Sequence, residues 1–522
     1  MGFKNVLNAG WKVAVVVAAV AILAVGWLTG AGDRLAIHIA SVTSPEVLDT
    51  VFLFPSRGDI LDCNGRVLAT NRVVHDIYMD PSVDMEDADW MAKADSLAKG
   101  LSALFGDRSP GKYLSIMTSG REKGKRYLRI RRNVDSLTIE RVRSLPLFNE
   151  SRSGGLLVES RTVRDYPYGP LAGRTLGLFR GGVIHDCDNI IGLEAKYDEY
   201  LAGNIGYQIR KNGKDGKSAK AVRTTRPVDG KDLLTSLDIA LQAKADSVLR
   251  AHIGGEEDIE GACLVIMRTA NGKIRTVVNL VRDKEFGDFR ELYNVAIGHQ
   301  FEPGVLLAPA TMLTSMKLGN VPSLDERTPA DQGQTYVDTL RNILAGGKTL
   351  ETWDIDGLRP ICLPGPPDNT RSVASPGPLG FGYGMTASCL DFLAFYNAIA
   401  RGGEAVCPRL LENAGTDTYR VCTKAQAGEL TEDLVQAAAG TGLQDAPCTV
   451  AGMSGVAKEA FPGGTYSDSR GRQKFVTTFA GFFPAEAPEY SIICMAYTKP
   501  TGSFHGQTLP ARTVKTLLDL IY

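Results

Sequence analysis

Residues 13–32 contain no charged side chain, and this stretch limits the possible architectures more than any other. About twenty apolar positions in an α-helix extend roughly 30 Å, the thickness of the hydrocarbon core of a bilayer. Lys4 and Lys12 precede the stretch and Asp33 closes it. Because positive residues stay on the cytoplasmic side, we expect residues 1–12 to be cytoplasmic, residues 13–32 to form one transmembrane helix, and the remainder to lie outside. A cleaved signal peptide is the alternative.

The rest of the composition is that of a globular protein. A chain of 522 residues is long enough for two or three domains, and its net charge of −1 gives no reason to expect a nucleic-acid partner. The nine cysteines occur singly, without C-x-x-C spacing, so neither a metal site nor a cofactor is predicted. Cys407 could bridge to Cys422 or Cys448 in an oxidising compartment. Free buried thiols are the alternative.

Hydrophobic periodicity predicts an α+β fold, with an antiparallel sheet covered by helices. The segment 207–227 is rich in Lys, Gly and Arg, which favours a hairpin or an exposed loop. The predicted helices span residues 87–104, 136–145, 239–252 and 511–522. The predicted strands span residues 233–238, 261–267, 274–280, 474–483 and 490–498.

Residues 301–311 read FEPGVLLAPAT. This segment resembles the active-site opening EPGS-x-F-K-x-x-T of the penicillin-binding transpeptidases. Val305 stands where that family has its nucleophilic serine, and Ala308 stands where it has a lysine. A serine attacks a carbonyl when a neighbouring group takes its proton, and helix positions three apart share a face. Valine and alanine can do neither task.

A second segment, residues 450–457, reads VAGMSGVA and resembles the family's VAGKTGTA. Met453 replaces the cationic lysine, and Val456 replaces a hydroxyl that binds the substrate carboxylate. Ser454 keeps a hydroxyl, and Gly455 keeps the close backbone approach. An apolar thioether cannot stabilise a carboxylate or a developing oxyanion. The family's middle motif, S-x-N, is not found. Ser372 lies in the expected interval, but no asparagine follows it at the required spacing.

Further segments resemble conserved elements of class B penicillin-binding proteins. They read RGDILDCNGRVLA at 57–69, RDYP at 164–167, GLEAKYDEYLAG at 192–203, LTSLDIALQ at 234–242, GFGYGMT at 380–386 and TFAGFFPA at 478–485. The resemblance implies an extended pedestal over residues 33–228 and a transpeptidase-like domain over residues 229–522. It also implies a buried polar knot in which Arg57 holds Glu194 and Asp238.

The resemblance and the replaced residues together predict a single-pass protein of the inner membrane that acts in cell-wall synthesis as an inactive pseudo-transpeptidase, with no catalytic residues. Relatives of this class pair with a polytopic glycan polymerase and with other division or elongation membrane proteins, so such partners are implied, and peptidoglycan peptide is a candidate ligand only. Two alternatives stay open. The chain is an active D,D-transpeptidase whose nucleophile is Thr314 or Ser454, or it is a non-covalent sensor of wall peptides or β-lactams.

Overall fold

The computed structural model describes residues 48–150, 154–177, 191–211, 220–319, 330–345 and 382–522, except 414, 416, 417, 462, 463, 503 and 505. The predicted cytoplasmic tail, the predicted transmembrane helix at 13–32 and Ser372 all lie outside the described residues. None of the helices in the described ranges combines the length and the apolar composition that a membrane crossing requires.

The chain divides into two compact units, residues 1–58 with 199–231 and residues 59–198 with 232–522. The described part of the first unit contains an antiparallel sheet in the order β1-β6-β7. Its strands are β1 (Leu48–Leu53), β6 (Gly206–Lys211) and β7 (Lys220–Thr225). Because β6 and β7 pair antiparallel, the hairpin expected within 207–227 is confirmed. The domain boundary between residues 228 and 229 stays a prediction.

Part of the second unit is a lobe in which helices pack on a small sheet built around the long strand β3. Helix α3 begins with Asp87 and Asp89, whose charges suit a helix N-terminus, and ends at Gly106, whose φ of 64° makes a left-handed cap. Trp90 and Tyr113 fill the core of the lobe. The lobe contains β3 (Val67–Met79), α3 (Asp87–Phe105), α4 (Pro110–Glu122), β4 (Leu128–Val134), α5 (Ser136–Arg143) and β5 (Leu156–Asp165). The same unit holds β2 (Ile60–Leu61), which pairs with β3, and the short helices α6 (Gly173–Leu176) and α7 (Gly192–Lys196), while α8 (Asp198–Ala202) crosses the unit boundary. The helices expected at 87–104 and 136–145 are confirmed.

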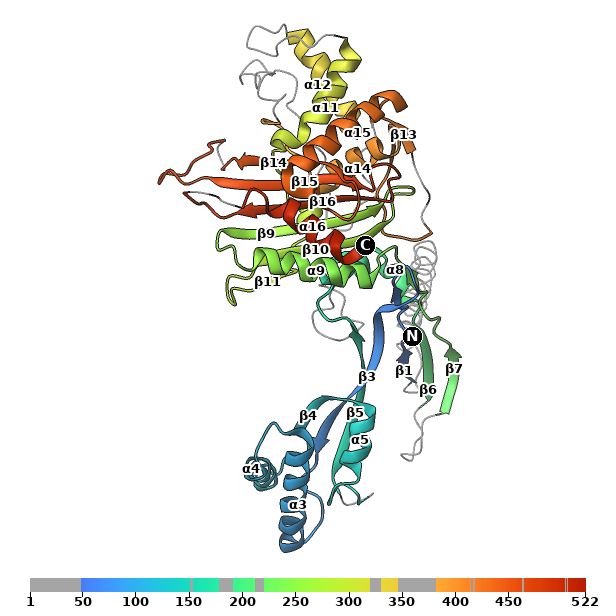
Figure 1. Ribbon diagram of the computed structural model, residues 1–522. Helices are drawn as coiled ribbons and strands as arrows, with labels where there is room; N and C mark the ends of the chain where they lie inside the picture. The colour runs from blue at the N-terminus through green and yellow to red at the C-terminus, as the bar shows by residue number, and fades with distance from the viewer. Residues whose placement is uncertain are drawn as a thin grey trace, which may run out of the picture. The chain divides into compact units, whose positions relative to one another are not determined.

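The second unit also holds a six-stranded, fully antiparallel sheet in the order β11-β10-β9-β16-β15-β14 (Figure 1). Its strands are β9 (Ile259–Arg268), β10 (Ile274–Arg282), β11 (Phe289–Arg290), β14 (Ala451–Glu459), β15 (Lys474–Phe483) and β16 (Tyr490–Thr498). The four strands expected at 261–267, 274–280, 474–483 and 490–498 are confirmed. The strand expected at 233–238 is shorter than predicted, because only Leu233–Leu234 forms the strand β8 and Thr235 adds an isolated bridge to Leu411. The Asp238 carboxylate accepts the N–H groups of Ala240 and Leu241 and thereby starts a helix.

Helices cover both faces of the six-stranded sheet. On one face, α9 (Ile239–Ile253) and α16 (Leu509–Ile521) share a core with Leu264 and Phe479 (Figure 1). On the other face lies α14 (Cys389–Ala400), whose Asn397 amide donates to Ser491 Oγ at 3.0 Å. Ser388 and Asp391 form a capping box that fixes the start of α14. The remaining elements are α10 (Val295–Gly298), η1 (Gly304–Leu307), α11 (Ala308–Leu318), α12 (Ala330–Ala345), β12 (Glu404–Val406), β13 (Thr418–Arg420), α15 (Lys424–Ala438) and η3 (Ala439–Leu443).

The cysteines in the described residues are free thiols. The bridge that the sequence allows between Cys407 and either Cys422 or Cys448 is therefore not formed, and the alternative of free thiols holds for these three residues.

Candidate functional site

The turn η1 begins with a glycine that two constraints require. Gly304 has a φ of 54°, a left-handed value that side chains with a Cβ rarely adopt. A Cβ atom at Gly304 would also lie 3.1 Å from the Cβ of Ala457 on β14. The Pro303-Gly304 pair therefore lets the turn lie directly against β14.

Val305 follows at the position expected for a nucleophile. Its side chain is 53% exposed, while its neighbours Gly304, Leu306 and Leu307 are buried. Ala308, three residues on, is half-buried and opens α11. Since positions i and i+3 eclipse each other in a 3₁₀ turn, Val305 and Ala308 present the same side of the chain. That side carries only methyl groups, which can neither attack a carbonyl nor accept a proton.

Strand β14 brings the second predicted segment to the same place. Gly455 lies so close to η1 that a Cβ atom there would sit 3.3 Å from the backbone nitrogen of Leu306. Met453 is two residues away and shares the face of Gly455, because alternate residues of a strand point the same way. The half-buried Met453 therefore supplies a thioether on this face where the family has an ammonium.

Hydrogen bonds from distant parts of the chain hold the turn. The hydroxyl of buried Tyr396 on α14 donates to Leu306 O at 3.0 Å. The carboxylate of Glu302 accepts the Tyr466 hydroxyl at 2.8 Å and the Gly384 N–H at 2.8 Å. Burial, and then the bond to Glu302, raises the pKa of Tyr466, so its hydroxyl stays protonated and acts as a donor. Hydrogen bonds from α14, Tyr466 and Gly384 therefore hold the segment that carries the turn.

Tyr396, Tyr466 and the role of Glu302 were not predicted from the sequence. Glu302 lies in the FEPG segment and Tyr396 lies on α14, but neither sequence indicates a partner. Tyr396 lies 90 positions from Leu306 and Tyr466 lies 164 positions from Glu302, so these contacts depend on the tertiary fold.

Ser454 points to the opposite face of the sheet from Gly455. Ser454 lies directly across from Phe479, and residues opposite each other on paired strands share a face. Phe479 packs into the core that α16 covers. The Ser454 Oγ is buried and, among the described residues, has no hydrogen-bond partner, so no base is positioned to take its proton. Val456 alternates with Gly455 in the same way and lies opposite Thr477.

Thr314, the other candidate nucleophile, lies on α11 with its side chain fully buried. Its hydroxyl donates to Ala310 O at 2.7 Å, the usual back-bond of a helical threonine. This hydroxyl satisfies the helix backbone and does not reach solvent, where a substrate would bind.

Two residues of the expected polar knot have other partners within their own unit. Glu194 accepts the Arg164 Nε–H at 2.7 Å, and both side chains are almost fully buried. Asp238 caps α9, as described above. Arg57 is buried but belongs to the first unit. The knot of Arg57, Glu194 and Asp238 stays a prediction, and the Arg164–Glu194 pair is an addition to it.

Glu291, in the segment that leads to η1, contacts the chain near α6. Its Oε2 accepts the Arg174 N–H at 2.8 Å, while Oε1 is buried and has no partner among the described residues. Burial raises the pKa of Glu291 to about 8, an effect that the carboxylate of Asp246 increases and that the Arg174 N–H and Arg250 oppose. Glu291 therefore holds a proton at neutral pH.

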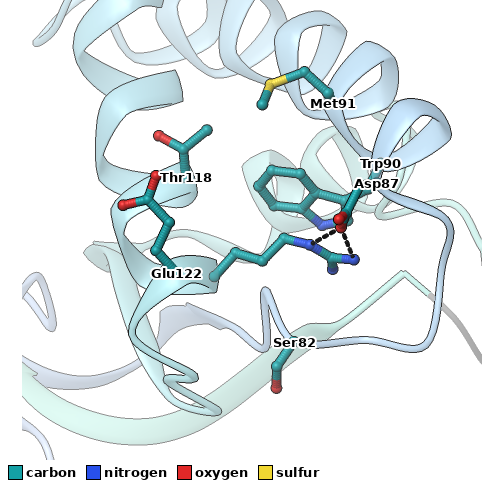
Figure 2. Close-up of a pocket in the computed structure, with 7 residues that line it drawn as sticks. Ser82, Asp87, Trp90, Met91, Thr118 and Glu122 are labelled. Atoms are coloured by element: carbon teal, nitrogen blue, oxygen red, sulfur yellow. Dashed lines mark hydrogen bonds and ion pairs between the residues drawn. The ribbon is translucent and has the colours of Figure 1, made fainter.

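The lobe carries an open pocket of about 530 Å³ between α3 and α4. Figure 2 shows Thr118 and Glu122 on one helix facing Trp90 and Met91 on the other. Arg121 crosses this pocket, with its guanidinium 4.8 Å from the Trp90 ring centre and bonded to Asp87 and to the carbonyls of residues 81, 83 and 85. Its hydrogen-bonding capacity is thus used within the lobe. Across the described parts of the chain, no group of three or more His, Cys, Asp or Glu side chains is arranged to hold a metal ion.

Two protein-family models match the chain. The Penicillin-binding Protein dimerisation domain matches residues 53–235, and the Penicillin binding protein transpeptidase domain matches residues 364–519, which include β14. The probable peptidoglycan D,D-transpeptidase PenA of Neisseria gonorrhoeae is 23% identical over 513 residues, covering 88% of this chain and 82% of PenA. The chain belongs to the class B penicillin-binding proteins. The predicted family is confirmed, and with it the α+β transpeptidase fold.

Further relatives resemble the chain over shorter stretches or in fold. The peptidoglycan D,D-transpeptidase FtsI of Escherichia coli (strain K12) is 25% identical over 270 residues, which cover 51% of this chain and 43% of FtsI. Penicillin Binding Protein 2X from Streptococcus thermophilus has a TM-score of 0.66 at 17% identity, covering 91% of this chain and 80% of that one. A Helicobacter pylori penicillin-binding protein, solved in complex with MreC, has a TM-score of 0.63 at 17% identity, covering 91% of this chain and 99% of that one. At these identities the solved structures establish the fold alone.

Proposed function

We propose that this class B penicillin-binding protein is a pseudo-transpeptidase, which serves peptidoglycan synthesis as a scaffold or regulator and forms no acyl-enzyme. One observation carries the proposal. The exposed side chain of the turn η1 is Val305, in a turn that the Tyr396 hydroxyl and the hydrogen bonds accepted by Glu302 hold in place.

The surrounding chemistry supports the same conclusion. Acyl transfer by a serine enzyme needs a nucleophile, a group that accepts its proton and donors for the developing oxyanion. Val305 provides no nucleophile and Ala308 provides no group that accepts a proton. Met453 provides no positive charge nearby. Ser454 faces the other side of the sheet and the Thr314 hydroxyl is bonded to Ala310 O, so neither is a substitute.

Membership of the family supports a proposal for the partners and the location. A protein of the same fold was solved in complex with MreC, and relatives over much of this chain are named peptidoglycan D,D-transpeptidases. We infer that residues 13–32 anchor this protein in the inner membrane, that the bulk is extracytoplasmic, and that it assembles with a polytopic glycan polymerase and other division or elongation proteins.

A fluorescent penicillin tests the proposal. Membranes containing the full-length protein are incubated with the probe and separated on a denaturing gel, with an active class B relative in the same sample as the positive control. We expect the control band to fluoresce and the band of this protein to stay dark. A fluorescent band that persists in the V305A variant but vanishes in S454A or T314A would instead establish an active enzyme with a different nucleophile.

Calorimetry separates the scaffold from a sensor. A purified muropeptide titrated to millimolar concentration should produce no heat of binding. Saturable heat, in a protein that the penicillin does not label, would favour a non-covalent sensor of wall peptides.

A further inference from the structure

Two cysteine thiols meet beneath the six-stranded sheet. The Sγ atoms of Cys263 and Cys389 lie 3.3 Å apart, and both side chains are completely buried. Cys263 belongs to β9, and Cys389 is the first residue of α14. The two positions are 126 residues apart in the sequence, so the tertiary fold alone brings them together.

Rigid elements hold both thiols in place. Cys263 lies in an inner strand, opposite Asn279 on β10 and opposite Met495 on β16. Cys389 follows Ser388, which caps α14, and Ala387, whose backbone exchanges two hydrogen bonds with Phe301 just before η1. The meeting of the two sulfurs is therefore fixed by a central strand and a capped helix.

We propose that Cys263 and Cys389 are a redox pair that closes to a disulfide bond under oxidising conditions. Bonded sulfurs lie about 2.05 Å apart, so the thiols need to approach by little more than 1 Å, which small rotations of the two side chains supply. The bond would join the centre of the sheet to the helix whose Tyr396 holds η1. This inference goes beyond the proposed function, and only the source of the oxidant in the cell rests on the proposed extracytoplasmic location.

The chemistry is thiol–disulfide exchange with a disulfide oxidant, such as an exported oxidoreductase or oxidised glutathione. The thiolate of one cysteine attacks the oxidant's disulfide, forms a mixed disulfide and releases one thiolate of the oxidant. The second cysteine, as a thiolate, attacks the protein sulfur of the mixed disulfide and releases the other. Two S–H bonds of the protein are lost, one S–S bond is formed, and the oxidant leaves as two thiols carrying the two protons.

Burial limits when this exchange can occur. The pKa of Cys263 is raised well above that of an ordinary thiol by burial and by the neighbouring Cys389. A thiol with a raised pKa and no solvent access reacts slowly, so the bond forms before the core closes or during transient opening.

Cys494 is a matched control for the pair. It is also completely buried and lies on β16 beside β9, but it is opposite Leu264 and packs into the core beneath α16, on the other face of the sheet. A C494A variant removes a thiol of the same burial and size without removing either member of the pair.

The test uses the full-length protein in detergent, held in mixtures of reduced and oxidised glutathione with enough urea to permit transient opening. Samples are alkylated with N-ethylmaleimide under denaturing conditions, and non-reduced peptides are mapped by mass spectrometry. We expect the peptides of Cys263 and Cys389 to appear linked in the wild type and in C494A, and unlinked in C263A and C389A. The linked protein should unfold at a temperature higher by about 5 °C than the reduced protein.

Alkylation of both Cys263 and Cys389 at every glutathione ratio would overturn the proposal, as would linkage of either one mainly to a different cysteine. The same mapping on protein alkylated directly from membranes reports the cellular state. Linkage in the glutathione mixtures together with free thiols from membranes would leave the redox pair established and would show that the closed core keeps it reduced in the cell.

Discussion

Among single residues, Gly304 is the position at which the backbone of η1 lies directly against β14. A Cβ atom at this position would be strained by the left-handed φ. It would also lie 3.1 Å from the Cβ of Ala457. Gly319 at the end of α11 offers a control, because its φ is 74° and a Cβ there would meet no atom within 4 Å. We expect G319A to lower the free energy of unfolding by about 1 kcal/mol and G304A by about 2 kcal/mol or more. Calorimetric unfolding of both variants measures the difference, and equal losses would show that β14 can move aside.

Val305, Ala308 and Met453 each lack one part of the acylation chemistry. The single variant V305S provides a hydroxyl but no group that takes its proton, so we expect no covalent labelling by penicillin. The triple variant V305S/A308K/M453K returns a base and a positive charge to an intact turn, and slow labelling is its expected result. Gel fluorescence after a long incubation measures both variants, and strong labelling of V305S alone would reveal a base that this account does not include.

Glu291 links stability to pH. The folded protein keeps the Glu291 proton up to about pH 8, whereas the unfolded chain releases it near the ordinary value of 4.5. The folded state therefore binds more protons between these two values, and the contribution of this group to stability is lost as pH rises through that window. We expect E291Q to remove a fall of about 3.5 kcal/mol in the free energy of unfolding between pH 5 and pH 8.

Denaturant unfolding at several pH values tests this expectation, with E285Q as the control, since Glu285 is exposed. If E291Q and the wild type show the same pH slope, the Glu291 carboxyl is ionised in the folded protein.

Among the elements, α4 is joined to the chain that leads into α3 by the hydrogen bonds of Arg121. Its Nη1 donates to Pro81 O at 2.9 Å, and its Nη2 donates to Met85 O at 2.7 Å and to Asp87 at 2.8 Å. A lysine cannot reproduce this fork of donors. We expect R121A to weaken the lobe by about 2 kcal/mol and R121K to restore less than half of that loss. Faster hydrogen–deuterium exchange in α3 and α4 would report this weakening of the lobe. R129A is the control, because Arg129 is exposed.

Elements with strong local signals were predictable from the sequence. The strand pair β15–β16 matches the predicted bounds because Pro484 and the polar residues after it interrupt two β-branched and aromatic runs. The strand expected at 233–238 was too long, because Asp238 was counted as strand although its carboxylate starts α9. Periodicity alone does not separate a strand end from a helix cap.

The site was predictable in outline because two of its segments resemble sequence motifs of the family. The segments at 301–311 and 450–457 were each identified from the sequence, and the structure places Gly304 and Ala457 side by side. The sequence could not show that Ser454 faces away from the turn, which depends on its pairing with Phe479. Nor could it show the meeting of Cys263 and Cys389, because 126 residues separate them.

At the scale of the whole molecule, a scaffold should keep its partners when its turn is altered. We expect full-length protein solubilised from membranes to copurify with a polytopic glycan polymerase, and the V305S variant to do so equally. A chain in which an unrelated membrane helix replaces residues 13–32 is the control for the anchor. Loss of the polymerase in V305S alone would point to a binding role for the turn and would weaken the scaffold account.

The exposed residue of the turn η1 is a valine, so we expect no covalent intermediate to form. Intact-mass spectrometry of the purified full-length protein after prolonged exposure to excess benzylpenicillin tests this expectation. We predict a single mass equal to that of the untreated protein. A species heavier by one penicilloyl group, mapped by peptide sequencing to any side chain of the 382–522 region or of η1 and α11, would contradict it.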